Sequence, residues 1–231
     1  ARPMPEPQEV LDKIARQYSM MGRYAEVSMN VVRDSREEFI QFEVFSADEQ
    51  RLRLEVSNPP RIKGSAIVRS GQNLWVSMPR IESVRHYTVK AKKKSDQAVF
   101  GSDLRLSDLF SSFDDYVSKI EPRELLNGER FVMTLTAPDN LLRYTMQLNA
   151  WDLPESITVE EMIQGNKYLP LRRLRALAWT GDNQSRRPQR MIIEDLKNPR
   201  RFTVVEILYW AGDRDFPDDL FEKPEARGKA L

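Results

Sequence analysis

Apolar and polar residues alternate with a period of two along most of the chain, which is typical of β-strands. The first clear case begins at Tyr24, where Val27 and Met29 alternate with polar residues. The same alternation, interrupted by turn-forming Asn, Asp, Gly and Pro, predicts six strands in residues 24–90 and further strands in residues 131–210. Because these strands follow one another without intervening helices, we expect consecutive antiparallel hairpins, about ten or eleven strands in all.

We expect two or three helices in all, and apolar residues three and four positions apart define two of them. The first lies within the N-terminal segment of residues 1–22: it begins at Pro7 and ends at Gly22, with an apolar face made of Val10, Leu11, Ile14, Tyr18 and Met21. The second begins at Ser107, a good helix cap, with an apolar face made of Leu109, Phe110, Phe113, Tyr116, Val117 and Ile120. The second is the most hydrophobic helix of the chain, and its spacing fits either a plug for the core or a lid over a cavity.

A short polar segment, Gly101-Ser102-Asp103, stands just before the second helix. Gly, Ser and Asp are residues that turns favour, because they tolerate unusual backbone angles or bond to their own backbone. We interpret this segment as a structural turn that positions the helix, not as a site of chemistry.

Charge and composition exclude several classes of protein. The 36 Lys and Arg residues nearly balance the 35 Asp and Glu residues, so the chain lacks the overall positive charge that attracts nucleic acid, and we expect no nucleic-acid partner. No apolar run approaches the ~18 residues of a membrane-spanning helix, and we expect no transmembrane segment. The absence of cysteine rules out disulfides, thiolate chemistry and a lipidated cysteine.

The length of 231 residues fits one domain spanning residues 1–231. Residues 213–231 form a polar C-terminal tail, in which we expect Phe216, Leu220 and Phe221 to anchor the tail to the body. Residues 1–7 are polar and rich in proline, as at the start of a mature secreted chain whose signal peptide has been removed. A trimmed cytoplasmic chain is the alternative.

The residues needed for catalysis are scarce. His86 is the only histidine, which excludes multi-histidine zinc sites, and no Gly-x-Ser-x-Gly turn accompanies it. Adjacent carboxylates such as Asp114-Asp115 point to different faces of an element, and no phosphate-binding or dinucleotide-binding loop is present. We therefore predict no catalytic residue, no metal site and no cofactor, and hence a protein that is not an enzyme.

The lysine-rich run at residues 90–94 is best explained as a solvated loop. A patch for nucleic acid or anionic lipid is the alternative, but no aromatic stacking platform accompanies the run.

Large and soft apolar side chains are frequent on the predicted strands and on the second helix. Methionine and aromatic side chains adapt to irregular apolar partners, as a protein that holds acyl chains requires, although an ordinary core has the same composition. The candidates for lining an apolar cavity are Met29, Phe42, Leu54, Trp75, Met78, Phe110, Phe113, Met133 and Met146.

Several motifs occur in a fixed order: Asn73-Leu74-Trp75 through Met78-Pro79-Arg80, then Ser83-Val84-Arg85, then Gly101-Ser102-Asp103-Leu104 with Leu106 and Asp108-Leu109. In order and spacing they resemble the outer-membrane lipoprotein-sorting protein family, which is similar to the periplasmic carriers LolA and LolB. Later matches run from Met191 to Asp195, from Phe202 to Val205 and from Phe216 to Phe221. The resemblance is most specific in residues 52–109 and 191–221.

The resemblance implies an α+β fold: one strongly curved, unclosed antiparallel sheet, a half-barrel whose concave face is covered by helices over an apolar cavity. It also implies a periplasmic carrier of a lipid or an acylated lipoprotein, working between an inner-membrane transporter and an outer-membrane acceptor. A chain without cysteine cannot be an acylated outer-membrane receptor, so the soluble carrier is the nearer analogue. The alternative is a non-catalytic envelope module that binds a protein partner through the same sheet.

Overall fold

The computed structural model describes residues 2–15, 24–48, 50–89, 97–110, 113, 115–125 and 128–225. The chain divides into two compact units, unit 1 (Ala1–Ser19 and Ser111–Val204) and unit 2 (Met20–Phe110 and Val205–Leu231).

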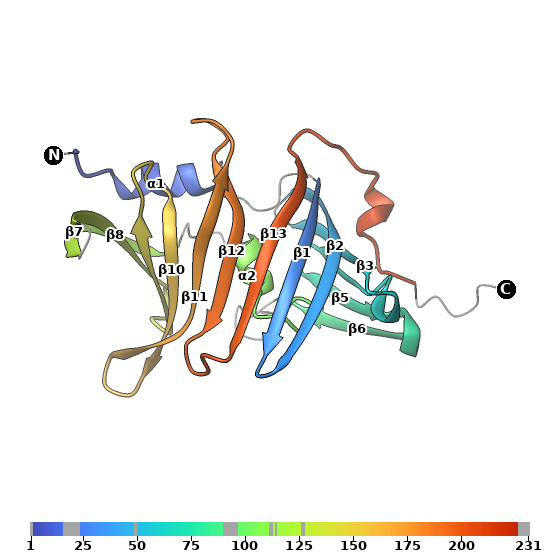
Figure 1. Cartoon of the computed structure of the whole chain (residues 1–231). Helices are drawn as coiled ribbons and strands as arrows, with labels where there is room; N and C mark the ends of the chain where they lie inside the picture. The colour runs from blue at the N-terminus through green and yellow to red at the C-terminus, as the bar shows by residue number, and fades with distance from the viewer. Residues whose placement is uncertain are drawn as a thin grey trace. The chain divides into compact units, whose positions relative to one another are not determined.

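Thirteen strands form one sheet, in the order β6-β5-β4-β3-β2-β1-β13-β12-β11-β10-β9-β8-β7 (Figure 1). Consecutive strands pair as antiparallel hairpins, and the order begins at β6 and ends at β7 without closing. The predicted single, unclosed antiparallel sheet is therefore confirmed, with more strands than the ten or eleven expected. The strand β13 (Arg201–Ala211) contributes residues to both units.

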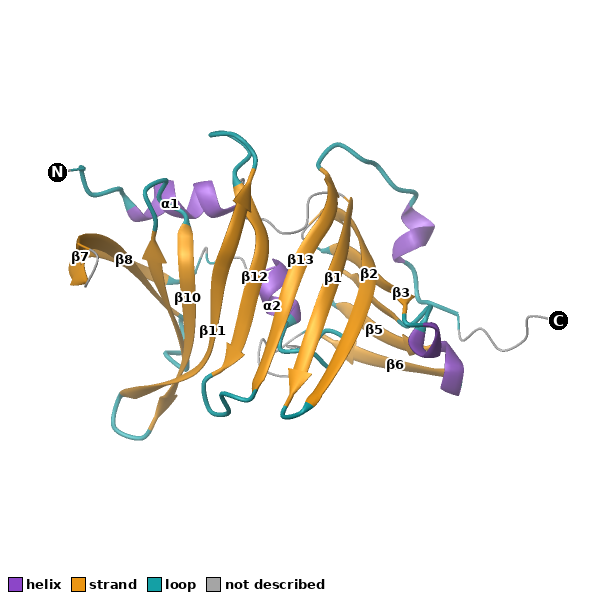
Figure 2. Ribbon diagram, in the orientation of Figure 1, coloured by secondary structure: helices purple, strands orange, loops and turns teal. Residues whose placement is uncertain are grey.

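Unit 2 contains most of the N-terminal half of the sheet (Figure 2). Its elements are β1 (Tyr24–Arg33), β2 (Arg36–Asp48), β3 (Arg51–Asn58), η2 (Pro60–Ile62), β4 (Ala66–Ser70), β5 (Asn73–Met78), η3 (Pro79–Ile81), β6 (Ser83–Thr88), α2 (Leu106–Phe110) and η4 (Asp218–Phe221). Unit 1 contains α1 (Pro7–Lys13), β7 (Val117–Leu125), β8 (Gly128–Thr136), β9 (Leu142–Leu148), β10 (Pro154–Ile163), β11 (Lys167–Thr180) and β12 (Arg187–Asp195).

The alternation seen in the sequence gives unit 2 one apolar face, which we call its core face. Directly opposed residues of antiparallel strands share a face, and Val27 opposes Phe42, which in turn opposes Val56. All three side chains are buried. The other face, which we call the outer face of unit 2, carries polar residues such as Glu43 and its partner Glu55.

The segment of residues 97–106 packs against the core face of unit 2. Val99 and Leu104 have no exposed surface, and the ring of Phe100 meets that of Phe42 edge-on at 5.6 Å. The Ser102 hydroxyl donates to the Val99 carbonyl at 2.6 Å and accepts the N–H of Leu104 at 3.1 Å. Gly101-Ser102-Asp103 is thus a structural turn, as predicted.

The prediction of a helix from Ser107 to Ile120 is wrong for its last part. The helix α2 is described at Leu106–Phe110, whereas Val117–Leu125 is the strand β7, paired with β8. Two features favour the strand. Val117 and Ile120 are β-branched, and Pro122 cannot continue a helix, so the ladder to β8 offers the backbone better hydrogen bonding.

The start of α2 also differs from the prediction. The Asp108 carboxylate accepts the N–H of Arg105 at 2.8 Å, reaching back to the residue before the helix as a capping-box acid does. Asp108, in the first turn, therefore stabilises the start of the helix. Ser107 had been expected to cap it.

The N-terminal helix is α1, which covers Pro7–Lys13 and buries Val10. The predicted helix end at Gly22, with Tyr18 and Met21, lies outside the described residues. Two basic residues hold this N-terminal segment to the turn between β9 and β10 in unit 1. Arg2 pairs with Asp152 at 2.5 Å, and the Lys13 ammonium donates to the Trp151 carbonyl at 2.7 Å.

Unit 1 has a core face of its own. One row of side chains crosses five strands, running Met133, Met146, Ile157, Leu174 and Ile193. Most of this row is buried.

The opposite face of unit 1 carries ion pairs. Glu160 accepts bonds from Arg143 at 2.7 Å and from the Thr145 hydroxyl at 2.9 Å. Burial acts to raise the pKa of Glu160, but these bonds outweigh it and lower the pKa below its ordinary value.

Candidate functional site

Three of the residues predicted to line an apolar cavity come together on the core face of unit 2. Met29, Phe42 and Leu54 are all buried, and the strand registers place them on one face. Phe100, from the segment of residues 97–106, contacts Phe42. In the described structure this part of the core face is therefore covered by the chain's own apolar side chains.

The other two candidates on unit 2 lie on different faces of β5. Met78 lies on the same face as Leu74, which is the core face, and is half-buried. Trp75 is one position out of phase and lies on the outer face, stacked on His86 with ring centroids 5.6 Å apart and planes at 24°. The structure therefore does not bring Trp75 together with Met29, Phe42 and Leu54.

The remaining candidates belong to unit 1, apart from Phe110. Met133 and Met146 are directly opposed on β8 and β9 and are buried. Phe113 packs edge-on against Tyr116 and Tyr144, each at 5.2 Å between ring centroids. Phe110 ends α2, and its side chain lies outside the described set.

This aromatic trio was not predicted as a unit, because Tyr116 was assigned to the helix and Tyr144 to a strand. Burial, followed by the nearby negative charge of Asp139, raises the pKa of the Tyr116 phenol. The trio gives the core side of unit 1 polarizable ring edges, a surface that apolar ligands also contact.

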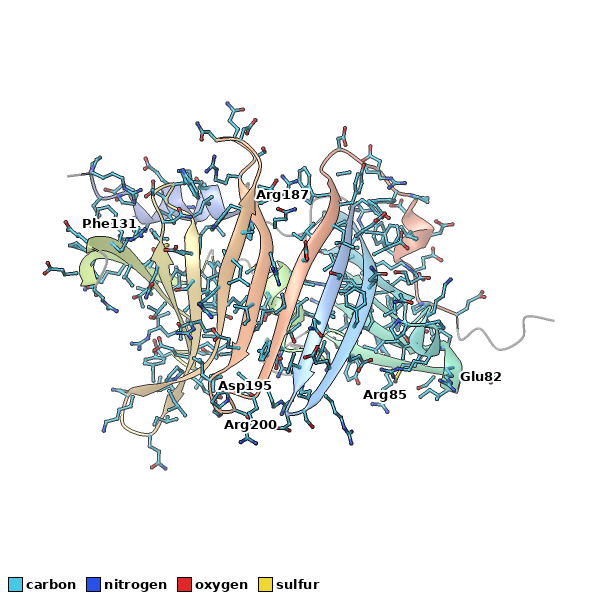
Figure 3. All side chains as sticks on the ribbon, in the orientation of Figure 1. Glu82, Arg85, Phe131, Arg187, Asp195 and Arg200 are labelled. Atoms are coloured by element: carbon cyan, nitrogen blue, oxygen red, sulfur yellow. The ribbon has the colours of Figure 1, made fainter. Side chains whose placement is uncertain are left out.

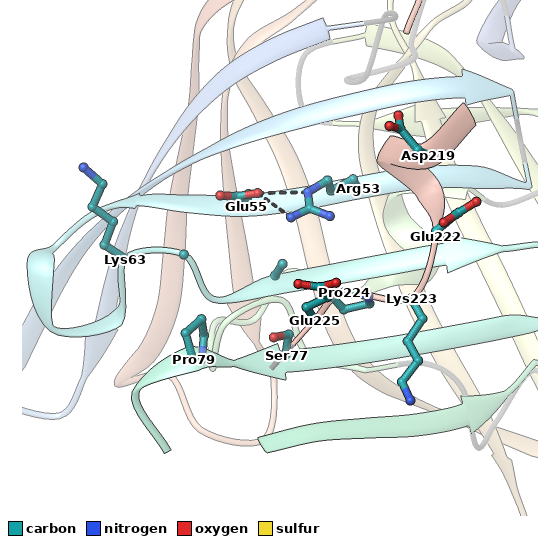
Figure 4. A pocket seen from close by; sticks show the side chains of 12 residues that line it. Arg53, Glu55, Lys63, Ser77, Pro79, Asp219, Glu222, Lys223, Pro224 and Glu225 are labelled. Atoms are coloured by element: carbon teal, nitrogen blue, oxygen red, sulfur yellow. Dashed lines mark hydrogen bonds and ion pairs between the residues drawn. The ribbon is translucent and has the colours of Figure 1, made fainter. Parts of the chain in front are cut away.

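A groove with a volume of about 640 Å³ lies on the outer face of unit 2 (Figure 4). Its floor is one row across three strands, Glu55, Ala66 and Ser77, as the registers show. Small side chains in two of these positions leave the hollow. Lys63 and Pro79 line the groove on the side where η2 and η3 lie.

The C-terminal segment of residues 213–225 provides the opposite wall of the groove through Asp219 and residues 222–225. Phe216 packs against Phe45 at 5.3 Å, and Phe221 is buried. Arg51 pairs with Asp218 at 2.5 Å. The prediction that Phe216 and Phe221 anchor the tail is therefore confirmed, and Leu220 is half-buried beside them.

Charged groups dominate this groove. Arg53 forms two bonds to Glu55, at 2.7 and 2.9 Å, which neutralise both groups (Figure 4). The wall adds Asp219, Glu222 and Glu225. The groove thus suits a polar ligand rather than an acyl chain. Sequence reasoning missed it, since its residues come from segments more than a hundred positions apart, and the only signal was the apolar residues of the tail.

A smaller hollow of about 350 Å³ lies in unit 1, lined in part by Arg2, Arg130 and Phe131. The Arg2 guanidinium lies 5.2 Å from the centre of the Phe131 ring, which is labelled in Figure 3. Arg2 also donates to the Ala150 carbonyl at 2.5 Å and pairs with Asp152. The donors of Arg2 are engaged within the chain, so the contacts of Arg2 at this hollow stabilise the N-terminal segment.

The described residues provide little for catalysis or metal binding. His86 is exposed, and its Nε2 lies 2.9 Å from the Asn73 side-chain oxygen, so it does not sit in a pocket beside carboxylates. No group of three or more His, Asp or Glu side chains within the described part of the chain is arranged to hold a metal ion. Among these residues no helix is long and apolar enough to cross a membrane.

An unclosed antiparallel sheet with a covered apolar face is the LolA-like fold, and comparison with solved structures supports this class. A LolA superfamily protein from Nitrosomonas europaea is 19% identical with a TM-score of 0.75, covering 95% of this chain and 99% of its own. A putative outer membrane lipoprotein-sorting protein domain from Vibrio parahaemolyticus is 12% identical with a TM-score of 0.71, covering 93% and 97%.

A third solved structure, a DUF1329 family protein from Desulfovibrio piger, is 16% identical with a TM-score of 0.72, covering 94% of this chain and 98% of its own. A family model described as that of an uncharacterized protein matches residues 48–225, and the chain belongs to this family. No curated protein matches the chain. The resemblance to the lipoprotein-sorting family that the sequence motifs indicated is therefore confirmed for the fold.

Proposed function

We propose that this protein is a non-catalytic carrier that binds the acyl chain of a lipid or lipoprotein against its apolar core faces. The observation that carries the proposal is the LolA-like fold, together with a core face of unit 2 whose cover is a short segment instead of a second sheet. Met29 and Phe42 would contact the acyl chain in unit 2, and Met133, Met146 and Phe113 in unit 1.

Binding of this kind is energetically reasonable. Each methylene removed from water contributes about 0.8 kcal/mol, so burying part of one acyl chain gives substantial affinity. The segment of residues 97–106 would have to move to admit a ligand, since Phe100 now contacts Phe42. Arg33 holds that segment by donating to the Asp103 carboxylate at 2.6 Å and to the Gly101 carbonyl at 3.0 Å, so opening has an identifiable cost.

The proposal places the mature protein in the periplasm, with its signal peptide removed, receiving cargo from an inner-membrane transporter and passing it to an outer-membrane acceptor. The names of the similar structures from Nitrosomonas europaea and Vibrio parahaemolyticus support this setting. No cofactor enters the proposal.

The test is to purify the protein without detergent and record its native mass spectrum. We expect a lipid-sized adduct, or uptake of an added photoreactive fatty acid that crosslinks to Met29 or Phe42 in unit 2 and to Met133 or Met146 in unit 1. The exposed Leu208, which is 52% accessible, provides the control position. A protein that neither retains nor accepts an acylated ligand, or that crosslinks only at Leu208, would refute the proposal.

A second candidate, an envelope module that binds a protein partner, is favoured by the polar groove of unit 2. Its charged lining does not suit an acyl chain. A partner whose binding is unchanged after lipid is removed would support this function.

A further inference from the structure

The two ends of the strand order, β6 in unit 2 and β7 in unit 1, differ in their ability to accept another strand. In an antiparallel pair each residue directs its N–H and C=O together, either toward its neighbour strand or away from it, in alternation. The registers therefore identify which backbone groups of β6 and β7 face outward.

On β6 the outward-facing groups follow from one hydrogen bond. Val89 donates its N–H to the Gln72 carbonyl at 2.7 Å, which makes this pair a hydrogen-bonded one. The β5–β6 register continues from this pair toward the start of β6, and every second residue of β6 bonds to β5. The residues whose N–H and C=O face away from β5 are Val84, His86 and Thr88.

These outward-facing groups have no partner among the residues that the structure describes. β6 is the last strand on its side of the sheet order. No described backbone or side-chain group bonds to the main chain of Val84, His86 or Thr88. An edge of this kind is a template on which an extended chain can add as a further strand.

The corresponding edge of β7 is less suited to an added strand. Ala137 donates to the Leu142 carbonyl at 2.9 Å, and carrying this register through β8 places Pro122 among the residues of β7 whose backbone faces outward. Proline has no N–H, so an added strand would lose a bond there. Lys119 and Arg123 also pair with Glu121, at 2.9 and 3.5 Å.

The side chains of β6 indicate the chemistry of a partner. Arg85 is exposed, as is Glu82, which comes just before the strand; both are labelled in Figure 3. His86 stacks on Trp75 and bonds Asn73, which fixes the edge in place. An acidic side chain opposite Arg85 would find a cation there.

We propose that the free edge of β6 binds an extended, acidic segment of a partner protein, which joins the sheet as an additional strand. The backbone groups of Val84, His86 and Thr88 provide the hydrogen bonds, and Arg85 selects for a carboxylate. This inference goes beyond the proposed lipid function and does not depend on it.

A second copy of the chain fits this edge poorly. Two antiparallel β6 strands can pair only with outward-facing residues opposite each other. The two registers with most overlap place either Arg85 opposite Arg85 of the second copy or His86 opposite His86 of the second copy. In the first register the two Arg85 side chains are directly opposed, and in the second they are diagonal neighbours roughly 7–8 Å apart. Like charges so placed disfavour pairing.

The test uses a ten-residue peptide that alternates Val and Glu, with a Val-Lys peptide as the charge control. Amide hydrogen exchange, followed by NMR, reports on each residue of β6. With the Val-Glu peptide we expect at least tenfold slower exchange at the amides of Val84, His86 and Thr88, and at least tenfold weaker binding of the Val-Lys peptide.

N-methylated peptides test the geometry. A residue opposite Arg85 directs its backbone away from β6, so when Glu occupies these positions the valine N–H groups face the edge. N-methylation of the valines should abolish binding, whereas N-methylation of the glutamates should leave it. The same affinity is expected with lipid-free and lipid-loaded protein, which separates this result from the acyl-binding test.

Two variants complete the experiment. Thr88→Pro removes one outward-facing N–H at an exposed position and should abolish binding while the melting temperature changes little. Arg85→Glu leaves the backbone intact and should reverse the preference toward the Val-Lys peptide, with Arg200→Glu, an exposed arginine of unit 1, as the control. The proposal is overturned if neither peptide binds at millimolar concentration, if protection appears elsewhere, or if dimerisation of the protein alone protects the same amides.

Discussion

The Arg33 guanidinium donates to the Asp103 carboxylate at 2.6 Å, joining the last residue of β1 to the turn that precedes α2. The pair is largely buried, with side-chain exposures of 23% and 10%. Arg33 also bonds the Gly101 carbonyl at 3.0 Å. This one arginine therefore fixes the segment that covers the core face of unit 2.

Replacing Asp103 with Asn should loosen this segment. The substitution removes the charge that Arg33 faces in a site of low solvent exposure, and we expect a loss of about 1–3 kcal/mol in the free energy of unfolding. Denaturant titration measures the loss, and exchange of the Leu104 amide, which bonds to Ser102, reports local opening. The matched control is Asp34→Asn, which neutralises an exposed carboxylate one residue after Arg33. Equal effects in the two variants would contradict the assignment.

In lipid-free protein, the core face of unit 1 should behave as a packed interior. Met133 is fully buried opposite Met146, so Met133→Ala should cost about 2–5 kcal/mol of stability. Met4→Ala is the control, because Met4 is 54% exposed and should change stability by less than about 0.5 kcal/mol. A near-neutral Met133→Ala in thermal and denaturant unfolding would mean that this position borders open space.

The period-two pattern was enough to predict consecutive antiparallel strands, because burial on one face imposes that pattern wherever a strand forms, whereas the unclosed form of the sheet was expected only from the family resemblance. The pattern was misread at residues 117–120. There Val117 and Ile120 also fit a helical spacing, and only the long-range pairing with β8 decides between the two structures. The position of Pro122 was the local signal against a helix.

The candidate cavity residues were chosen because they are large and apolar. Whether each one lies on the core face depends on which face of its strand it occupies. Trp75 and Met78 are both large and apolar, but they stand an odd number of positions apart on β5, so their side chains point to opposite faces. Trp75 therefore lies on the outer face beside His86. The groove of unit 2 was not predictable, since its wall comes from residues 219–225 and its floor from residues 55–77. No local sequence pattern predicts that these two segments lie next to each other.

The C-terminal wall of the groove should depend on one buried ring. Phe221 is 1% exposed, so Phe221→Ala should cost about 3–5 kcal/mol and free residues 213–225 from the outer face of unit 2. Limited proteolysis should then cut this segment at a lower protease concentration. Leu208→Ala, at an exposed site, is the control. Unchanged proteolysis in Phe221→Ala would show that Arg51 and Phe216 hold the segment without it.

The stability of unit 1 should fall in acid through Glu160. Its folded pKa lies below the ordinary value of 4.5, because the bonds from Arg143 and Thr145 outweigh the opposing effect of burial. A depressed carboxylate pKa stabilises the fold above the unfolded-state pKa, and this contribution disappears as pH falls through the folded pKa. Glu160→Gln should therefore lower the melting temperature at pH 7. The difference in melting temperature between this variant and the wild type should become smaller as pH drops below 4.5. Melting temperatures recorded from pH 7 to pH 3 measure this, with the exposed Glu155→Gln as the control. If the destabilisation of Glu160→Gln were the same at every pH, the ionised carboxylate would not be its cause.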